Sequence, residues 1–188
     1  EDIRTLAAFF ASHGTTGFLT SVLTDTEEQT SLAISRITQA MHQPTGGARV
    51  LGIHLEGPFL SYEKKGAQNG DWLRNPDAEL LRRLIAASNG LVKLVSVAPE
   101  LPGAIDFIES VGEEVTVSLA HTTADYDTAM KAFRAGARQV THLFNAMPPF
   151  SHRAPGVVGA ALDTPGCMVE LICDGVHIHP SVVRAVFR

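Results

Sequence analysis

Residues 114–144, EVTVSLAHTTADYDTAMKAFRAGARQVTHLF, contain two predicted strands with a helix between them. The segment EVTVSLAH is rich in β-branched and apolar residues, as strands are, and ends in a histidine. The segment ADYDTAMKAFRAG has apolar residues at helical spacing and closes on Gly136. The segment QVTHLF is again typical of a strand. This order of strand, helix and strand favours a parallel sheet.

The same alternation extends along the chain in both directions. Four further strands are predicted at 15–23, 49–57, 91–100 and 168–175. Helical patterns cover 1–14, 25–42, 76–88 and 102–112, and another helix begins at 181. Six strands separated mostly by helices, several of them almost continuously apolar, predict a parallel sheet that is covered on both faces.

Two architectures are compatible with this order. A doubly wound Rossmann or flavodoxin-like sheet is disfavoured in its nucleotide-binding forms, because no GxGxxG or GxxxxGK[ST] motif follows any predicted strand. A complete (β/α)8 barrel typically needs about 250 residues, and the chain has 188. We therefore expect an α/β fold, a partial (β/α)8 TIM barrel of about six consecutive βα units. Residues 1–188 are then a single catalytic-barrel fragment that lacks the first and last barrel strands.

The composition is that of an ordinary globular chain with an acidic balance. The formal charge is −5 and 45% of the residues are apolar, which allows a sizeable core. No apolar run approaches the roughly 18 residues of a membrane span, and the first residues do not resemble a signal peptide. The acidic balance argues against nucleic acid as a partner. Cys167 and Cys173 form no CxxC pair, so neither a disulfide framework nor a zinc knuckle is indicated, and a cytoplasmic location is expected. The lack of a long apolar run predicts no membrane partner.

Acidic and imidazole side chains stand where predicted strands end. Glu56, His121 and His142 each lie at or near the end of a different strand. The carboxyl ends of barrel strands open on one face, so these residues are expected to converge. Two imidazoles and a carboxylate suit a divalent ion such as Zn²⁺, although each residue taken alone also fits a structural role. His54 shares the strand face of Glu56 and is either a fourth ligand or a supporting residue.

A long segment without helical period follows His142. Loops longer than about 12–15 residues in compact domains are usually functional or disordered. Asn145 and Arg153 are natural hydrogen-bond donors to an anionic group, and the guanidinium can bind two phosphate oxygens at once. Free backbone N–H groups around Ala146 would add to such a site. The segment is therefore predicted to bind an anion.

Three stretches resemble the N-acetylglucosamine-6-phosphate deacetylases of the amidohydrolase superfamily. They are GIHLEGPFLSYEKKGAQN over 52–69, the run over 118–163 that contains THLFNAM, and ICDGVHIHP over 172–180. The similarity runs in order along essentially all of the chain. It implies a metal-dependent (β/α)8 hydrolase, with zinc or iron, that removes acetate from N-acetylglucosamine 6-phosphate and leaves glucosamine 6-phosphate. It also implies a homodimer.

The resemblance assigns roles to particular residues. Metal ligands are expected at Glu56, His121 and His142, and substrate contacts at Ala67, Gln68, Asn145, Ala146, Arg153 and His177. Gln68 stands where the family often has histidine, and an amide can donate a hydrogen bond but cannot act as an acid. The family's first-strand His-x-His would precede residue 1, and its catalytic aspartate would follow Arg188. We therefore expect no catalytic acid–base within these residues, and little activity from them alone.

Other functions share part of this pattern. A different amidohydrolase, such as a dihydroorotase-like enzyme or a deaminase, would share the metal ligands without needing Asn145 and Arg153 as a phosphate-binding pair. A non-catalytic sugar-phosphate binding module would keep the loop without needing a metal. A purely structural fragment would need neither. Metal content and binding of a sugar phosphate distinguish these possibilities.

Overall fold

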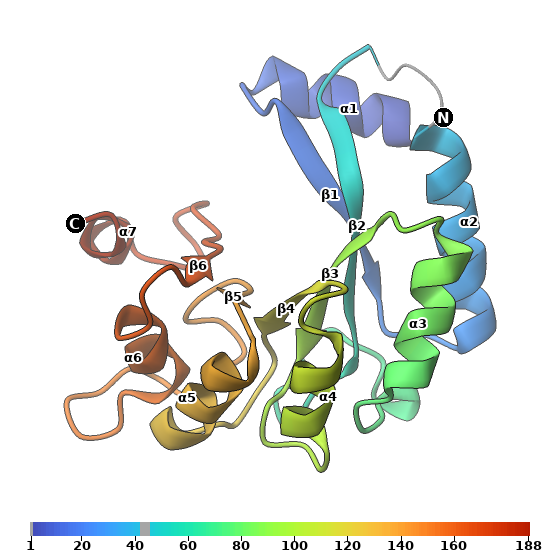
Figure 1. Ribbon diagram of the computed structural model, residues 1–188. Coiled ribbons are helices and arrows are strands. Elements are labelled where there is room, and N and C mark those ends of the chain that lie inside the picture. Colours follow the sequence, from blue (N-terminus) through green and yellow to red (C-terminus); the bar gives the residue numbers. More distant parts are fainter. Residues whose placement is uncertain (1, 42–45) are drawn as a thin grey trace.

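The computed structural model describes residues 2–41 and 46–188, and Figure 1 shows them as a curled sheet with helices along its outer side. Among these residues six parallel strands lie side by side in chain order. The strands are β1 Gly17–Leu23, β2 Arg49–Phe59, β3 Val92–Val97, β4 Thr116–Leu119, β5 Gln139–Val140 and β6 Met168–Val169. The predicted partial (β/α)8 barrel is confirmed.

Helices follow the strands in turn. They are α1 Asp2–Ser12, α2 Glu27–Met41, α3 Ala78–Ala87, α4 Ala104–Val111, α5 Tyr126–Ala135, α6 Gly156–Leu162 and α7 Pro180–Val186, with a 3₁₀ turn η1 at Gly70–Trp72. The last residue of the helix predicted at 25–42 lies outside the described residues. Local chemistry explains where α3 and α5 begin, because Asp77 and Asp125 each accept a hydrogen bond from a backbone N–H of the first turn.

The two faces of the sheet differ in polarity. Val95, Val97, Val117 and Leu119 are fully buried in the core cluster that also contains helical residues such as Leu81. Several of the buried strand residues on the opposite face are polar. They include His54, Ser96 and Ser118, which are also buried. Because successive strand side chains point to opposite faces, the sheet presents an apolar face to the helices and a polar layer to the inside of the curve.

Three expectations about the fold are corrected. The helices do not cover both faces of the sheet, because the sheet curls and α2 to α5 lie along its outer side (Figure 1). The strands predicted at 139–144 and 168–175 are shorter, since β5 ends at Val140 and β6 at Val169. His142 and Phe144 have φ values of 34° and 78°, and such left-handed residues cannot continue a strand.

Helix α6 was not predicted. Its sequence, GVVGAAL, is small and apolar at every position, and six of its seven residues are buried. A helix that is buried all round lacks the alternation of polar and apolar faces from which helices are predicted. The long loop after His142 is therefore interrupted by a short helix that packs against α5.

Two further expectations concern the cysteines and membrane-spanning segments. Cys167 and Cys173 are both free thiols. Within the part of the chain that the structure describes, no helix combines the length and the apolar character needed to cross a bilayer.

Candidate metal centre

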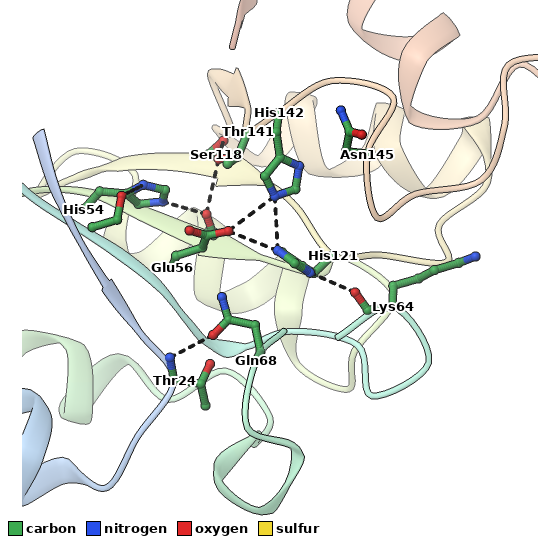
Figure 2. Close-up of polar contacts among 12 residues, drawn as sticks. Thr24, His54, Glu56, Lys64, Gln68, Ser118, His121, Thr141, His142 and Asn145 are labelled. Atoms are coloured by element: carbon green, nitrogen blue, oxygen red, sulfur yellow. Dashed lines mark hydrogen bonds and ion pairs between the residues drawn. The ribbon is translucent and has the colours of Figure 1, made fainter. Parts of the chain in front are cut away.

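Glu56, His121 and His142 bring three possible ligand atoms together near the carboxyl ends of β2, β4 and β5 (Figure 2). Glu56 lies three residues before the end of β2, and each histidine follows the end of its strand by two residues. The Nε2 atom of His121 lies 3.0 Å from Oε1 of Glu56, and the Nε2 atom of His142 lies 3.3 Å from the same oxygen. The two Nε2 atoms are 3.1 Å apart. The side chains are 8–16% exposed. The sequence predicted that these residues would converge, and they do.

The main chain turns sharply at both histidines. His121 has a φ of 43° and His142 a φ of 34°, in the left-handed region that residues other than glycine rarely adopt. A strand residue would continue the alternation of faces, whereas a left-handed residue turns the chain away from the sheet. Strained residues of this kind cluster at functional sites and persist when surrounding contacts hold them in place.

One hydrogen bond determines how His121 presents its ring. Its Nδ1 atom lies 2.8 Å from the carbonyl oxygen of Lys64, and because a carbonyl only accepts, Nδ1 must carry the proton. In the neutral ring Nε2 therefore has a free lone pair, directed at Glu56 and His142. Metal-binding histidines usually donate their other ring nitrogen to an acceptor in this way.

The charges in this cluster fit a bound cation. The imidazoles of His121 and His142, whose Nε2 atoms lie 3.0 and 3.3 Å from its Oε1 atom, hold the pKa of the Glu56 carboxyl well below its ordinary value. Burial alone would lower the pKa of His142, but the hydrogen bond and the charge of Glu56 outweigh burial and raise it. Two imidazole nitrogens 3.1 Å apart that face one carboxylate form a compact donor set, and nitrogen and oxygen donors of this kind suit zinc or iron.

His54 belongs to a separate polar layer beneath the triad. Its Nε2 atom lies 2.8 Å from the hydroxyl of Ser96, and its Nδ1 atom lies 3.3 Å from that of Ser21. Thr141 continues the layer, since its hydroxyl contacts those of Ser96 and Ser118. Burial lowers the pKa of His54 to about 4, so the ring is neutral at pH 7. Both its nitrogens face hydroxyls, which favours the supporting role over the fourth ligand.

Gln68 lies beside the triad (Figure 2), and a hydrogen bond on the side away from the triad fixes its side chain. Its side chain is buried, and its Oε1 atom accepts a 2.8 Å hydrogen bond from the backbone N–H of Thr24 at the end of β1. With the oxygen committed to Thr24, the amide nitrogen is directed to the opposite side, which in Figure 2 is the side of Glu56. The neighbouring Ala67 is exposed. Gln68 is thus placed to offer an N–H donor to a group at the triad.

The other predicted substrate contacts are spread over exposed or half-buried segments. Asn145, whose amide donates to the carbonyl of Leu143, stands beside His142 in Figure 2. Arg153 is exposed and lines a groove of about 550 Å³ that also contains Asp125 and Asp127. His177 pairs with Asp174 at 2.7 Å. The roles of these residues and of Ala146 in substrate binding stay predictions.

Glu100 was not predicted as a functional residue from the sequence. It is the last residue of the strand predicted at 91–100, the same kind of position that singled out Glu56. Its carboxylate accepts hydrogen bonds from the two threonines that follow His121. A signal for it was thus present, but only the fold shows what the carboxylate holds.

Comparison with known proteins places the chain in a family. Residues 1–187 match the Amidohydrolase family. The chain is 41% identical over 178 residues to an N-acetylglucosamine-6-phosphate deacetylase from Bacillus subtilis, an alignment that covers 93% of this chain and 45% of that protein. It is 36% identical over 179 residues to an N-acetylgalactosamine-6-phosphate deacetylase from Escherichia coli, with coverages of 95% and 48%.

A solved structure is similar as well. A mutant of the N-acetyl-D-glucosamine-6-phosphate deacetylase from Mycobacterium smegmatis, in complex with N-acetyl-D-glucosamine-6-phosphate, superposes with a TM-score of 0.88 at 34% sequence identity. The match covers 98% of this chain and 46% of that one. The chain spans about half the length of the curated relatives it matches.

Proposed function

The chain belongs to the amidohydrolase family, and we propose that the whole protein hydrolyses the acetamido group of N-acetylglucosamine 6-phosphate to glucosamine 6-phosphate and acetate. The observation that carries the proposal is the triad of Glu56, His121 and His142 at the ends of three strands. The relatives named as deacetylases of this sugar phosphate support the choice of substrate.

The triad is proposed to hold a divalent metal, zinc or iron. Glu56 would contribute a carboxylate oxygen, and His121 and His142 their Nε2 atoms. A divalent metal bound there supplies Lewis acidity, which polarises the amide carbonyl and lowers the pKa of water. The chain itself prepares the site, because the Lys64 carbonyl keeps the proton of His121 on Nδ1 and leaves Nε2 free.

Gln68 is proposed to orient the acetamido group. Its oxygen is held by Thr24, so its amide N–H is free to donate to a substrate oxygen. A neutral amide neither gives up nor takes a proton at pH 7. Gln68 therefore binds and orients, and the acid–base step requires another group. We propose that this group is an aspartate beyond Arg188, and that residues 1–188 alone catalyse poorly for that reason.

The segment after His142 is proposed to bind the 6-phosphate. Arg153 supplies a guanidinium and Asn145 an amide, with the backbone of Ala146 between them in sequence. Ala67 and His177 are proposed to contact the sugar. A homodimer and a cytoplasmic location also stay predictions.

N-acetylgalactosamine 6-phosphate is a second candidate substrate, because one relative is named for its deacetylation. The two sugars differ only in the orientation of the hydroxyl on C4, so both carry the acetamido group and the phosphate that the proposed site would read. The preference between them is a difference in kcat/KM.

The test is acetate release by the purified whole protein with stoichiometric zinc or ferrous iron. We expect efficient turnover of one of the two sugar phosphates and poor turnover of unphosphorylated N-acetylglucosamine. Removal of the metal with a chelator should abolish activity, and its return should restore it. Full activity without metal, or equal kcat/KM with and without the phosphate, would contradict the proposal.

A further inference from the structure

Glu100 forms a clamp on the segment that follows His121. The residue lies three positions after the end of β3, and its Oε1 atom accepts from the backbone N–H of Thr123 at 2.6 Å and from the Thr123 hydroxyl at 2.9 Å. Its Oε2 atom accepts from the hydroxyl of Thr122. One carboxylate therefore receives three hydrogen bonds from two consecutive residues.

The clamp acts next to a strained backbone position. Thr122 is fully buried and directly follows His121, whose φ of 43° is unfavourable for a residue with a Cβ atom. Such a conformation persists when the surroundings fix the chain on both sides. On one side Ala120 donates its N–H to the carbonyl of Val97 in β3. On the other side the carbonyl of His121 accepts from the backbone N–H of Ser61 at 2.9 Å, and the side-chain contacts that fix the next two residues are those to Glu100.

A second connection runs from the clamp to the predicted substrate segment. The backbone N–H of Thr122 donates to the carbonyl of Ala146 at 3.0 Å, and Ala146 is itself left-handed, with a φ of 52°. The Thr122 hydroxyl also accepts from the N–H of Ala124 at 2.9 Å. Thr122 is thus held by Glu100 through its side chain while it holds Ala146 through its main chain.

We infer that Glu100 is a positioning residue that aims the imidazole of His121 at the metal and fixes the main chain at Ala146, acting through Thr122 and Thr123. The inference rests on the proposed function, because it requires His121 to be a ligand. Glu100 is not itself in the group of possible ligands found among the described residues. Its oxygens are already occupied by the three hydrogen bonds.

A carboxylate suits this position better than an amide does. An ionised carboxylate accepts hydrogen bonds on both oxygens, whereas glutamine presents an oxygen on one side and an NH₂ group on the other. In Glu100→Gln the oxygen can still serve Thr123, but the NH₂ group would face the hydroxyl of Thr122. The substitution keeps the shape and removes one acceptor, so it should produce a smaller effect than Glu100→Ala.

The experiment measures zinc affinity of the whole protein by competition with a chelator, at a temperature where every variant is folded. Loss of a residue that orients a metal ligand typically weakens metal binding about 10–100-fold. We expect a loss in that range for Glu100→Ala and a smaller loss for Glu100→Gln. Glu114→Gln is the matched control, because Glu114 also accepts two hydrogen bonds, from Arg82, but lies on the outer surface. Its affinity should equal that of the wild type.

Two further readouts separate positioning from general support of the fold. The visible absorption of the Co²⁺-loaded protein reports ligand geometry and should change in both Glu100 variants but not in Glu114→Gln. If Glu100 acts through the threonines, combining Glu100→Ala with Thr122→Val should cost less affinity than the sum of the two single changes.

The outcomes are distinct. Folded Glu100→Gln and Glu100→Ala variants with wild-type zinc affinity and an unchanged cobalt spectrum would overturn the inference and leave the proposed function standing. Should Glu100→Ala fail to fold, Glu100→Gln decides by the same two measurements. Wild-type protein that binds no divalent metal would overturn the proposed function and this inference together.

Discussion

The candidate metal triad and the outer segment, by which we mean Asn145, Arg153 and His177, differ in how the chain holds them. The triad side chains are 8–16% exposed and contact one another directly, each at the end of a different strand. Arg153 and His177 are exposed, and Asn145 is half-buried with a hydrogen bond to the carbonyl two residues earlier. The sheet fixes the first group, whereas loops carry the second.

This difference predicts different behaviour without ligand. A site on strand ends is preorganised, because the strands are held by the sheet and the core behind it. A site on loops can complete its geometry when the ligand arrives. We therefore expect the triad to bind metal in the absence of substrate, and the outer segment to matter only when the phosphate is present.

The largest expected effect is on metal binding by the triad. Replacing Glu56, His121 or His142 with alanine should weaken zinc binding by more than about 100-fold, the upper end for residues that only orient a ligand. Metal content per chain, measured by elemental analysis after gel filtration, tests this. Asn145→Ala is the comparison within the outer segment and should retain stoichiometric metal. Stoichiometric binding that survives all three triad substitutions would remove the assignment.

The second effect is on substrate choice. Arg153→Ala should raise the activation free energy for the phosphorylated sugar by about 2–5 kcal/mol if the guanidinium makes a desolvated, charge-assisted contact. Activity on unphosphorylated N-acetylglucosamine should stay the same, as should zinc affinity. Kinetics on both sugars with wild type, Arg153→Ala and Arg153→Lys measure the change. An equal loss of kcat/KM for the phosphorylated and the unphosphorylated sugar would show that Arg153 does not bind the phosphate.

A smaller effect is expected at Gln68, whose side chain is hydrogen-bonded to the backbone at the end of β1. Gln68→Met keeps the length of the side chain but leaves the N–H of Thr24 without its acceptor. An unsatisfied buried donor typically costs about 1–3 kcal/mol of stability. Chemical denaturation of the metal-free protein measures this. If kcat/KM of the Gln68→Met variant also falls while its zinc affinity is unchanged, this would support a role in orienting the substrate. Unchanged kcat/KM would limit Gln68 to a structural role.

The smallest expected effect is the change in zinc affinity for each unit of pH. The pKa of His142 is raised in the metal-free chain because the Glu56 carboxylate outweighs burial, and a proton on His142 competes with a cation. Zinc affinity should fall about tenfold per pH unit below that raised pKa while one proton is displaced. The stability of the metal-free protein depends on pH in the opposite direction from zinc affinity. The raised pKa stabilises the fold below the ordinary pKa, and this contribution is lost as pH rises through the raised value.

Isothermal titrations with zinc at several pH values, in two buffers of different ionisation enthalpy, count the protons released. His142→Gln should bind zinc more weakly at every pH and show a flatter pH dependence of the binding that remains, whereas His177→Gln, in the outer segment, should leave both unchanged. An affinity that is independent of pH between 5 and 7 in wild type would contradict the role of His142.

Much of the fold was predictable because burial leaves a periodic signal. The strand–helix–strand pattern of 114–144 and its repetition along the chain indicated a partial barrel, and Asp77 and Asp125 are recognisable helix caps. The convergence of Glu56, His121 and His142 followed from one rule about parallel strands. Helix α6 left no such signal, because its sequence GVVGAAL contains no polar residue that would mark one face.

The sequence by itself determined the order of the elements and the chemical types at the strand ends, since both depend on neighbours a few residues away. The tertiary structure alone decided that β5 stops at Val140, that the carbonyl of Lys64 sets the tautomer of His121, and that Glu100 clamps the residues after it. His121 lies 57 positions after Lys64 in the sequence, and Thr123 lies 23 positions after Glu100. No local period encodes such pairs, because they arise only when the curled sheet brings different strand ends to one place.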